Sequence, residues 1–162
     1  MRESWYDTAQ ICWNGHIVNP AATSYPAMNA SFCALCGAVV LTACPYCRTP
    51  IRGEYHLSDV VPAGPFVRPN YCDSCGLPYP WTQDRIRAAE ELADELDALT
   101  DAERELLKGS IRELARDTPR TRLAVSRFRR LVDKVGPGAL ESFREILVDI
   151  LSEAVKRAIW GQ

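Results

Sequence analysis

The amino-acid sequence predicts an α+β protein, in which an N-terminal double zinc ribbon of short β-strands and two structural zinc sites precedes a C-terminal four-helix α domain. All seven cysteines lie in the first half of the 162-residue chain, and six of them form Cys-x-x-Cys pairs. That half is rich in proline, glycine and aromatic residues, whereas after Trp81 charged residues become frequent and apolar residues recur at helical spacing. We therefore predict a double zinc-ribbon domain over residues 1–81 and an α-helical domain over residues 82–162.

The cysteines are spaced as ligands of metal ions. A zinc ion binds four ligands in a tetrahedron, and cysteine thiolates and histidine nitrogens are its usual ligands. The seventh cysteine, Cys12, is completed by His16, so the chain offers enough ligands for two Zn2+ ions. Grouped in chain order, they are Cys12, His16, Cys33 and Cys36 in site 1 and Cys44, Cys47, Cys72 and Cys75 in site 2. An interleaved grouping, as in cross-brace folds, and a disulfide framework are the alternatives.

The residues around the pairs predict tight turns joined by short strands. A Cys-x-x-Cys turn directs both sulfurs to one point, and a glycine after the second cysteine eases the turn because glycine readily adopts a positive φ. Gly37 and Gly76 occupy that position, whereas Arg48 follows Cys47. Residues 38–43 and 51–57 are apolar, β-branched or aromatic and lie between turn residues, which indicates ribbon strands.

Composition and charge exclude some functions. Hydrophobic residues make up 47% and charged residues 25% of the chain, which is enough apolar material for a buried core. The net charge of −2 gives no overall attraction to nucleic acid. No apolar run is long enough to span a bilayer, so we expect no membrane partner. Cysteines that bind metal must stay reduced, which favours the cytoplasm or another reducing compartment.

Three short strings make the first half resemble a known family. They are Cys12-Trp13-Asn14-Gly15-His16, Arg52-Gly53-Glu54-Tyr55-His56 and Pro78-Tyr79-Pro80-Trp81-Thr82. Together with the Cys-x-x-Cys pairs, they resemble a family of small bacterial double-zinc-ribbon proteins of unknown function, and the similarity extends into the second half. The resemblance implies the fold and the metal ligands, and it implies no activity.

Four helices are expected in the second half. Thr82 is a candidate N-cap for a first helix that continues to about Leu99. The string from Thr100 to Glu103 is a capping box, which predicts the start of a second helix. Thr118 followed by Pro119 predicts the start of a third, since proline is favoured in the first helical position. Gly136-Pro137-Gly138 would end that helix, and a fourth would extend from about residue 139 to 159.

The helix predicted over residues 119–135 carries a basic face. Its positive side chains are Arg120, Arg122, Arg127, Arg129, Arg130 and Lys134. Such a face could bind the phosphates of nucleic acid or an acidic protein partner. Alternatively, it could lie beside the predicted first helix, whose outer face is acidic, so that the two faces compensate each other within one chain or between two.

The predicted fourth helix is apolar over more than the roughly 100° that one-sided burial requires. Its candidate contacts for self-association are Phe143, Val148, Ile150, Leu151, Val155 and Ile159. Either the helix is central in its own bundle, or its second apolar edge meets the same helix of another subunit. We favour the second, and therefore expect a dimer or higher oligomer.

Glu54 and His56 are the remaining candidates for chemistry, on one face of a predicted strand. They would support an enzyme or effector only if a substrate could reach them. Since all the predicted zinc ligands are paired, the sequence favours a non-enzymatic zinc-binding interaction module, in which the ribbons present a binding surface and the helices bind a protein partner or a second copy. Nucleic-acid binding through the ribbons and the basic helix over residues 119–135 is the alternative, and an enzyme or effector that uses Glu54 and His56 is the second alternative.

Overall fold

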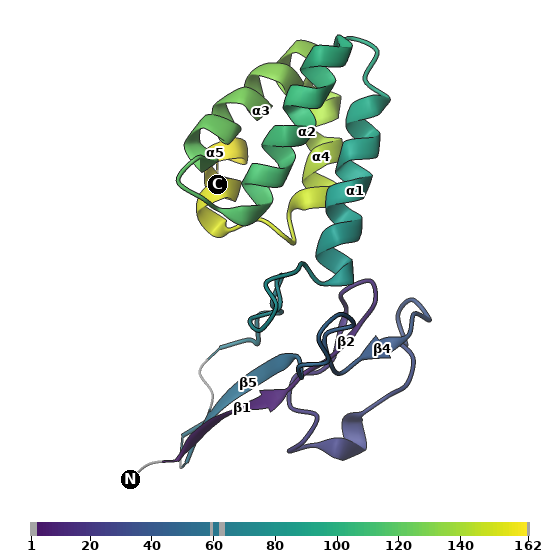
Figure 1. Cartoon of the computed structure of the whole chain (residues 1–162), viewed down its shortest axis with the longest axis vertical. Helices are drawn as coiled ribbons and strands as arrows, with labels where there is room; N and C mark the ends of the chain where they lie inside the picture. The colour runs from purple at the N-terminus through teal and green to yellow at the C-terminus, as the bar shows by residue number, and fades with distance from the viewer. Residues whose placement is uncertain (1–2, 59, 62–63, 162) are drawn as a thin grey trace. The chain divides into compact units, whose positions relative to one another are not determined.

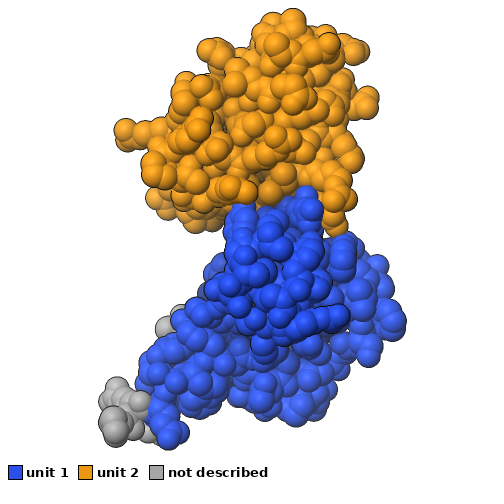
Figure 2. All heavy atoms as spheres, viewed as in Figure 1, with its two compact units in different colours: residues 1–83 blue, residues 84–162 orange. Residues whose placement is uncertain are grey.

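The computed structural model describes residues 3–58, 60–61 and 64–161. The chain divides into two compact units, residues 1–83 and 84–162 (Figure 2). Each unit contains a cluster of buried side chains of its own. Short β-strands lie in unit 1 and helices form unit 2, which is the α+β class expected from the sequence, with five α-helices rather than four in the described residues (Figure 1).

Unit 1 holds two small antiparallel sheets. Strand β1 (Ser4–Thr8) pairs with β5 (Arg52–Leu57), and strand β2 (Gln10–Cys12) lies between β3 (Ile17–Asn19) and β4 (Val40–Leu41). A single 3-10 turn, η1 (Pro26–Met28), follows β3. Strands β4 and β5 lie within the two segments that the sequence predicts to be extended. The remaining backbone of this unit consists mainly of turns and loops.

The core of unit 1 is built around four large side chains and two thiols. Ile11, Ile51, Tyr79 and Trp81 are each no more than 1% exposed, and they cluster with Ala9, Cys44 and Cys72. The rings of Tyr79 and Trp81 stack at 4.6 Å, and the indole Nε1 of Trp81 donates a hydrogen bond to the carbonyl of Pro69 at 3.0 Å. Because this apolar cluster is small, bonds to metal ions would supply much of the stability of the unit.

A buried carboxylate fixes the loop after β3. Asp7 on β1 accepts hydrogen bonds from the backbone N–H groups of Thr8, Thr23 and Ser24 and from the hydroxyl of Ser24. Burial raises the pKa of Asp7, but these hydrogen bonds lower the pKa by more, so the carboxyl titrates below its ordinary value. The ionised side chain therefore ties residues 22–24 to the edge of the sheet.

Unit 2 consists of helices packed around one apolar core. The helices are α1 (Pro80–Asp94), α2 (Asp101–Arg116), α3 (Thr121–Val135), α4 (Pro137–Leu147) and α5 (Glu153–Trp160), and α1 begins in unit 1. The capping box predicted at Thr100 is confirmed: its hydroxyl accepts from the N–H of Glu103, whose carboxylate accepts from the N–H of Thr100. Leu107, Ile111, Leu114 and Phe128 are completely buried at the centre.

Two predicted helix starts are shifted. Helix α1 begins at Pro80, so Thr82 lies inside its first turn and is buried rather than a cap. Helix α3 begins at Thr121, because Thr118 caps a turn instead: its hydroxyl accepts from the N–H of Arg120 at 3.2 Å. In both places the capping residues in the sequence predict correctly that a helix begins nearby, but they misplace its first residue by two or three positions.

The predicted fourth helix is two helices, α4 and α5. The chain leaves the helical path after Leu147, and Ser152 begins α5 by accepting a hydrogen bond from the N–H of Val155 at 3.3 Å. The intervening turn buries Ile150 and Leu151, and α5 packs against α3. The break lets two short helices cover the core from different sides, so one long apolar stripe does not need an external partner.

The residues expected to mediate self-association are therefore used inside the chain. Buried residues of the unit 2 core, each at most 5% exposed, include Phe143, Ile150, Leu151, Val155 and Ile159, and only Val148 is partly exposed. They could meet a second subunit only if this core opened. Self-association of the protein stays a prediction, but an interface between subunits would have to use other side chains than these buried ones.

Candidate metal centres

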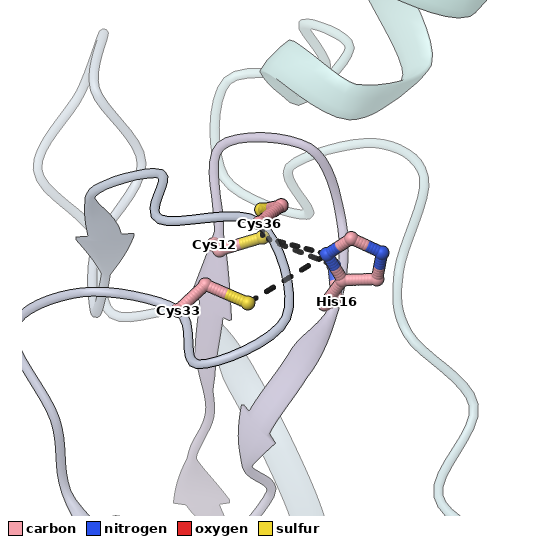
Figure 3. Close-up of side chains that lie close together, drawn as sticks. All are labelled: Cys12, His16, Cys33 and Cys36. Carbon is pink, nitrogen blue, oxygen red and sulfur yellow. Dashed lines mark hydrogen bonds between the residues drawn. The ribbon is translucent and has the colours of Figure 1, made fainter.

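The first tetrad of ligand residues comes from β2, the turn after it and one Cys-x-x-Cys turn. Cys12 ends β2, His16 precedes β3, and Cys33 and Cys36 flank the next turn (Figure 3). The Nδ1 atom of His16 lies 3.4 Å from the sulfur of Cys12 and 3.6 Å from that of Cys33, and the sulfurs of Cys12 and Cys36 are 3.8 Å apart. All four side chains therefore converge on one point.

The second tetrad is built by two Cys-x-x-Cys turns. The sulfurs of Cys44 and Cys75 are 3.8 Å apart, and those of Cys47 and Cys72 are 3.6 Å apart. In each tetrad all ligand atoms lie within 4.8 Å of one another, and these are the two such groups in the described residues. The structure thus gathers the ligands in chain order, not in the interleaved arrangement, and all seven cysteines are free thiols rather than disulfides.

These distances fit a tetrahedral metal site. With metal–sulfur bonds of about 2.3 Å and metal–nitrogen bonds of about 2.0 Å, the edges of a tetrahedron are about 3.8 Å between two sulfurs and about 3.5 Å between sulfur and nitrogen. The observed separations match both edges. Three thiolates with one imidazole, and four thiolates, are soft donor sets of the kind that structural zinc sites use.

The three Cys-x-x-Cys turns share one backbone pattern. In each turn the first cysteine makes two backbone hydrogen bonds of 2.8–2.9 Å. Its N–H donates to the carbonyl of the residue five positions later, and its carbonyl accepts from the N–H of the residue four positions later. The residue after the second cysteine is left-handed in all three, with φ of 73° at Gly37, 67° at Arg48 and 73° at Gly76. Arg48 therefore adopts a conformation that its Cβ disfavours.

Replacing Arg48 should reveal the cost of that conformation. We expect Arg48→Gly to stabilise the turn by about 1 kcal/mol, because glycine adopts this φ without steric strain. The side chain of Arg48 is exposed and makes no ion pair within the described residues, so little else is lost. Competition for zinc with a chromogenic chelator would measure the change as tighter retention at site 2.

The matched control for this prediction is Gly76→Ala, in the partner turn of the same site. It introduces a Cβ at the equivalent left-handed position, where no atom beyond the two neighbouring residues of the chain lies within 4 Å of it. The alanine should therefore weaken metal retention through backbone strain alone. Equal retention by Arg48→Gly and the unaltered protein would show that the turn carries no such strain.

Residues outside the tetrads hold site 1 in place. The side-chain nitrogen of Asn14 donates to the sulfur of Cys36 at 3.4 Å, and the N–H of His16 donates to the sulfur of Cys12 at 3.3 Å. Gly15 has φ of 90°, and its carbonyl accepts a hydrogen bond from Arg68. A Cβ at Gly15 would collide with Arg68 and Trp81. The Asn-Gly-His string is therefore explained by the support that it gives to the site.

Hydrogen bonds also favour thiolates at two of the sulfurs. The N–H of Ala38 and the amide of Asn14 lower the pKa of Cys36 to about 6, and Thr49 does the same for Cys47 through its hydroxyl and its N–H. Burial instead raises the pKa of Cys12. Each tetrad therefore contains at least one thiol poised to lose its proton near neutral pH, which is the form that binds a metal ion.

Comparison with known proteins identifies the family. A family model described as "Uncharacterized protein conserved in bacteria (DUF2321)" matches residues 5–159, almost the whole chain. The chain belongs to this family. No curated protein and no solved structure matches it. The DUF2321 match covers both units, so the ribbons and the helices belong to one family architecture, as the resemblance in the sequence indicates.

The structure gives His56 a partner other than Glu54. Its Nε2 lies 3.5 Å from a carboxylate oxygen of Asp7, and its ring stacks on Trp5 at 5.2 Å. The side chain of His56 is only 15% exposed. Sequence reasoning missed Asp7, because the contact depends on the pairing of β1 with β5. Trp5 and Asp7 thus hold His56 in a packed, largely buried position.

The basic residues of α3 lie where the predicted helix wheel places them. Ala124, Phe128, Leu131 and Val132 are buried, and Arg122, Arg129 and Arg130 are exposed on the other side of the helix. Lys134 forms an ion pair with Glu103 of α2 at 2.8 Å, which lowers the pKa of Glu103 to about 2. The other basic side chains of α3 make no ion pair within the described residues.

Proposed function

We propose that this protein is a non-enzymatic, zinc-binding interaction module whose first ribbon binds a protein partner. Both tetrads would hold Zn2+ as structural ions, since each offers four ligands at tetrahedral spacing and none of these positions is needed for water or substrate. Thiolate ligands persist in a reducing compartment, which supports a cytoplasmic location. Within the described part of the chain no helix is both long and apolar enough to cross a membrane.

A row of exposed apolar side chains beside site 1 carries this proposal. Trp13, Phe32, Leu35 and Val39 are 40%, 65%, 79% and 46% exposed. Val39 pairs with Phe32 in an isolated β-bridge, and its carbonyl accepts from the N–H of Trp13 at 2.9 Å. Neighbours in a ladder at one register share a face, so Trp13, Phe32 and Val39 lie on one face, and the patch that we propose consists of these three side chains and Leu35 in the adjacent Cys33–Cys36 turn.

The metal would make this patch rigid. Phe32 and Leu35 flank or separate the two ligands Cys33 and Cys36, and Trp13 directly follows Cys12. A bound ion therefore fixes three of the four apolar side chains through adjacent backbone. Aromatic and large aliphatic side chains held in advance lose little conformational entropy on binding, which is typical of the central residues of protein interfaces.

Site-specific photo-crosslinking in bacterial cells tests the proposal. A benzoyl-phenylalanine in place of Leu35 should yield one dominant crosslinked protein, identified by mass spectrometry, and the adduct should disappear when Cys12→Ser removes site 1. The control position is Glu141, which is exposed on α4. Adducts of the same pattern at both positions, or adducts that survive the loss of site 1, would contradict the proposed surface.

A further inference from the structure

The outer face of α3 carries arginines that form no ion pair within the described residues. Arg122 and Arg129 lie on the edge next to α5, and Arg127 and Arg130 lie on the edge next to α2. Among these, the guanidinium of Arg129 donates to the carbonyl of Ala158 at 3.4 Å, and none forms an ion pair with a carboxylate in the described residues. These four guanidinium groups therefore have no carboxylate within ion-pair distance, although Glu105 and Glu113 of α2 line the same pocket as Arg127.

The acidic helix of the same unit does not neutralise them. Glu90 and Asp94 of α1 pair with Arg112 and Lys108 of α2, and α2 lies between α1 and α3 (Figure 1). This corrects the expectation that α1 and α3 compensate each other within the chain. In unit 2, therefore, the acidic side chains Glu90 and Asp94 of α1 form ion pairs with basic side chains of α2, whereas the four arginines of α3 form none within the described residues.

The composition of this face favours a polyanion over a protein surface. Ser126 and Asp133 lie between the two arginine edges. The one large apolar side chain of this outer face is Leu123, which is 46% exposed. A protein interface needs a desolvated apolar centre, whereas binding to a phosphate backbone depends on distributed positive charge. Arginine also suits phosphate, since its planar fork can donate two parallel hydrogen bonds.

We propose that the outer face of α3 binds the phosphodiester backbone of nucleic acid without reading its base sequence. Arg122 and Arg129 are seven residues apart, which corresponds to about 10 Å along the helix axis, so the edge can contact phosphates that are not adjacent. The face is formed by unit 2 alone, and the proposal is therefore independent of the apolar patch on the first ribbon. Asp133 would lie between the contacted phosphates and limit the affinity.

Fluorescence anisotropy with the zinc-loaded full chain tests this proposal. The probes are labelled single-stranded DNA, single-stranded RNA and duplex DNA, each about 20 nucleotides long. We expect log K to fall linearly with log salt concentration, with a slope of about −3 for about four phosphate contacts. Arg122→Gln and Arg130→Gln should each reduce the magnitude of the slope by about 1 and weaken binding equally for unrelated base sequences.

Arg112→Gln is the matched control, because Arg112 of α2 is paired with Glu90 of α1 and lies outside the proposed face. Its slope should equal that of the unaltered chain, and circular dichroism should show unchanged helix content in all variants. Binding to only one kind of probe would support the proposal and identify the nucleic acid. Absence of binding at about 20 mM salt, an unchanged slope in a chain that carries both Arg122→Gln and Arg130→Gln, or equal competition by polyglutamate would overturn it.

Discussion

Cys44→Ser should reduce the zinc content from two ions to one and unfold the part of unit 1 around site 2, while site 1 and the helices of unit 2 remain. Cys44 is 1% exposed and belongs to the cluster that contains Ile51, Tyr79 and Trp81, so site 2 and the apolar core share side chains. A structural zinc ion contributes about 10–16 kcal/mol in small peptides, which is comparable to the total stability of a domain. Native mass spectrometry would count the ions, and far-UV circular dichroism would report the helices.

Ser74→Ala is the control for this experiment. Ser74 lies between Cys72 and Cys75 and is exposed, so its loss should leave two ions and an intact unit 1. A Cys44→Ser chain that keeps both ions would contradict the assignment of site 2. Loss of helix signal in step with the metal would contradict the division of the chain into two separately stabilised units.

The converse result is expected for Phe128→Ala, which should destabilise unit 2 by about 3–5 kcal/mol while both metal ions stay bound. Phe128 is completely buried on α3, and its ring meets that of Phe143 edge-on at 5.3 Å. Truncation would remove this contact and leave a cavity between α3 and α4. Chemical denaturation followed by circular dichroism would measure the loss, and the zinc count would stay at two.

The matched control is Leu123→Ala on the same helix. Leu123 is 46% exposed, so its truncation should change the stability by less than about 0.5 kcal/mol. Alanine has the higher helix propensity, so a loss of stability cannot come from propensity, and comparable losses from both substitutions would show that burial of Phe128 does not determine the result. Release of a zinc ion from Phe128→Ala would show that unit 1 depends on the helical core.

The features that the sequence predicts well are encoded by residues close together in the chain. A Cys-x-x-Cys turn and the capping box at Thr100 each depend on about four consecutive residues, and both occur in the structure. Charge and spacing also predict the basic outer face of α3, because the helical period alone determines which side chains share a face. The tetrads follow from the same local turns once the pairs are grouped in chain order.

The features that the sequence does not predict depend on packing between segments that are distant in the chain. The apolar pattern continues through residues 148–152, so periodicity cannot locate the break between α4 and α5, which exists because α5 packs against α3. Asp7 receives its hydrogen bonds from residues 16 and 17 positions later, and His56 approaches it only through strand pairing. Likewise, α2 rather than α3 pairs with the acidic α1.

The unequal exposure of the cysteines has a chemical consequence. Cys36 and Cys75 are exposed, whereas Cys12, Cys33, Cys44 and Cys72 are buried. An alkylating reagent or peroxide in solution therefore reaches Cys36 and Cys75 before the four buried cysteines, since attack on a thiolate requires access to it. The lifetime of the folded ribbons in an oxidising medium would then depend on how fast these two sulfurs react, and the covered ones would become vulnerable only after the metal had left.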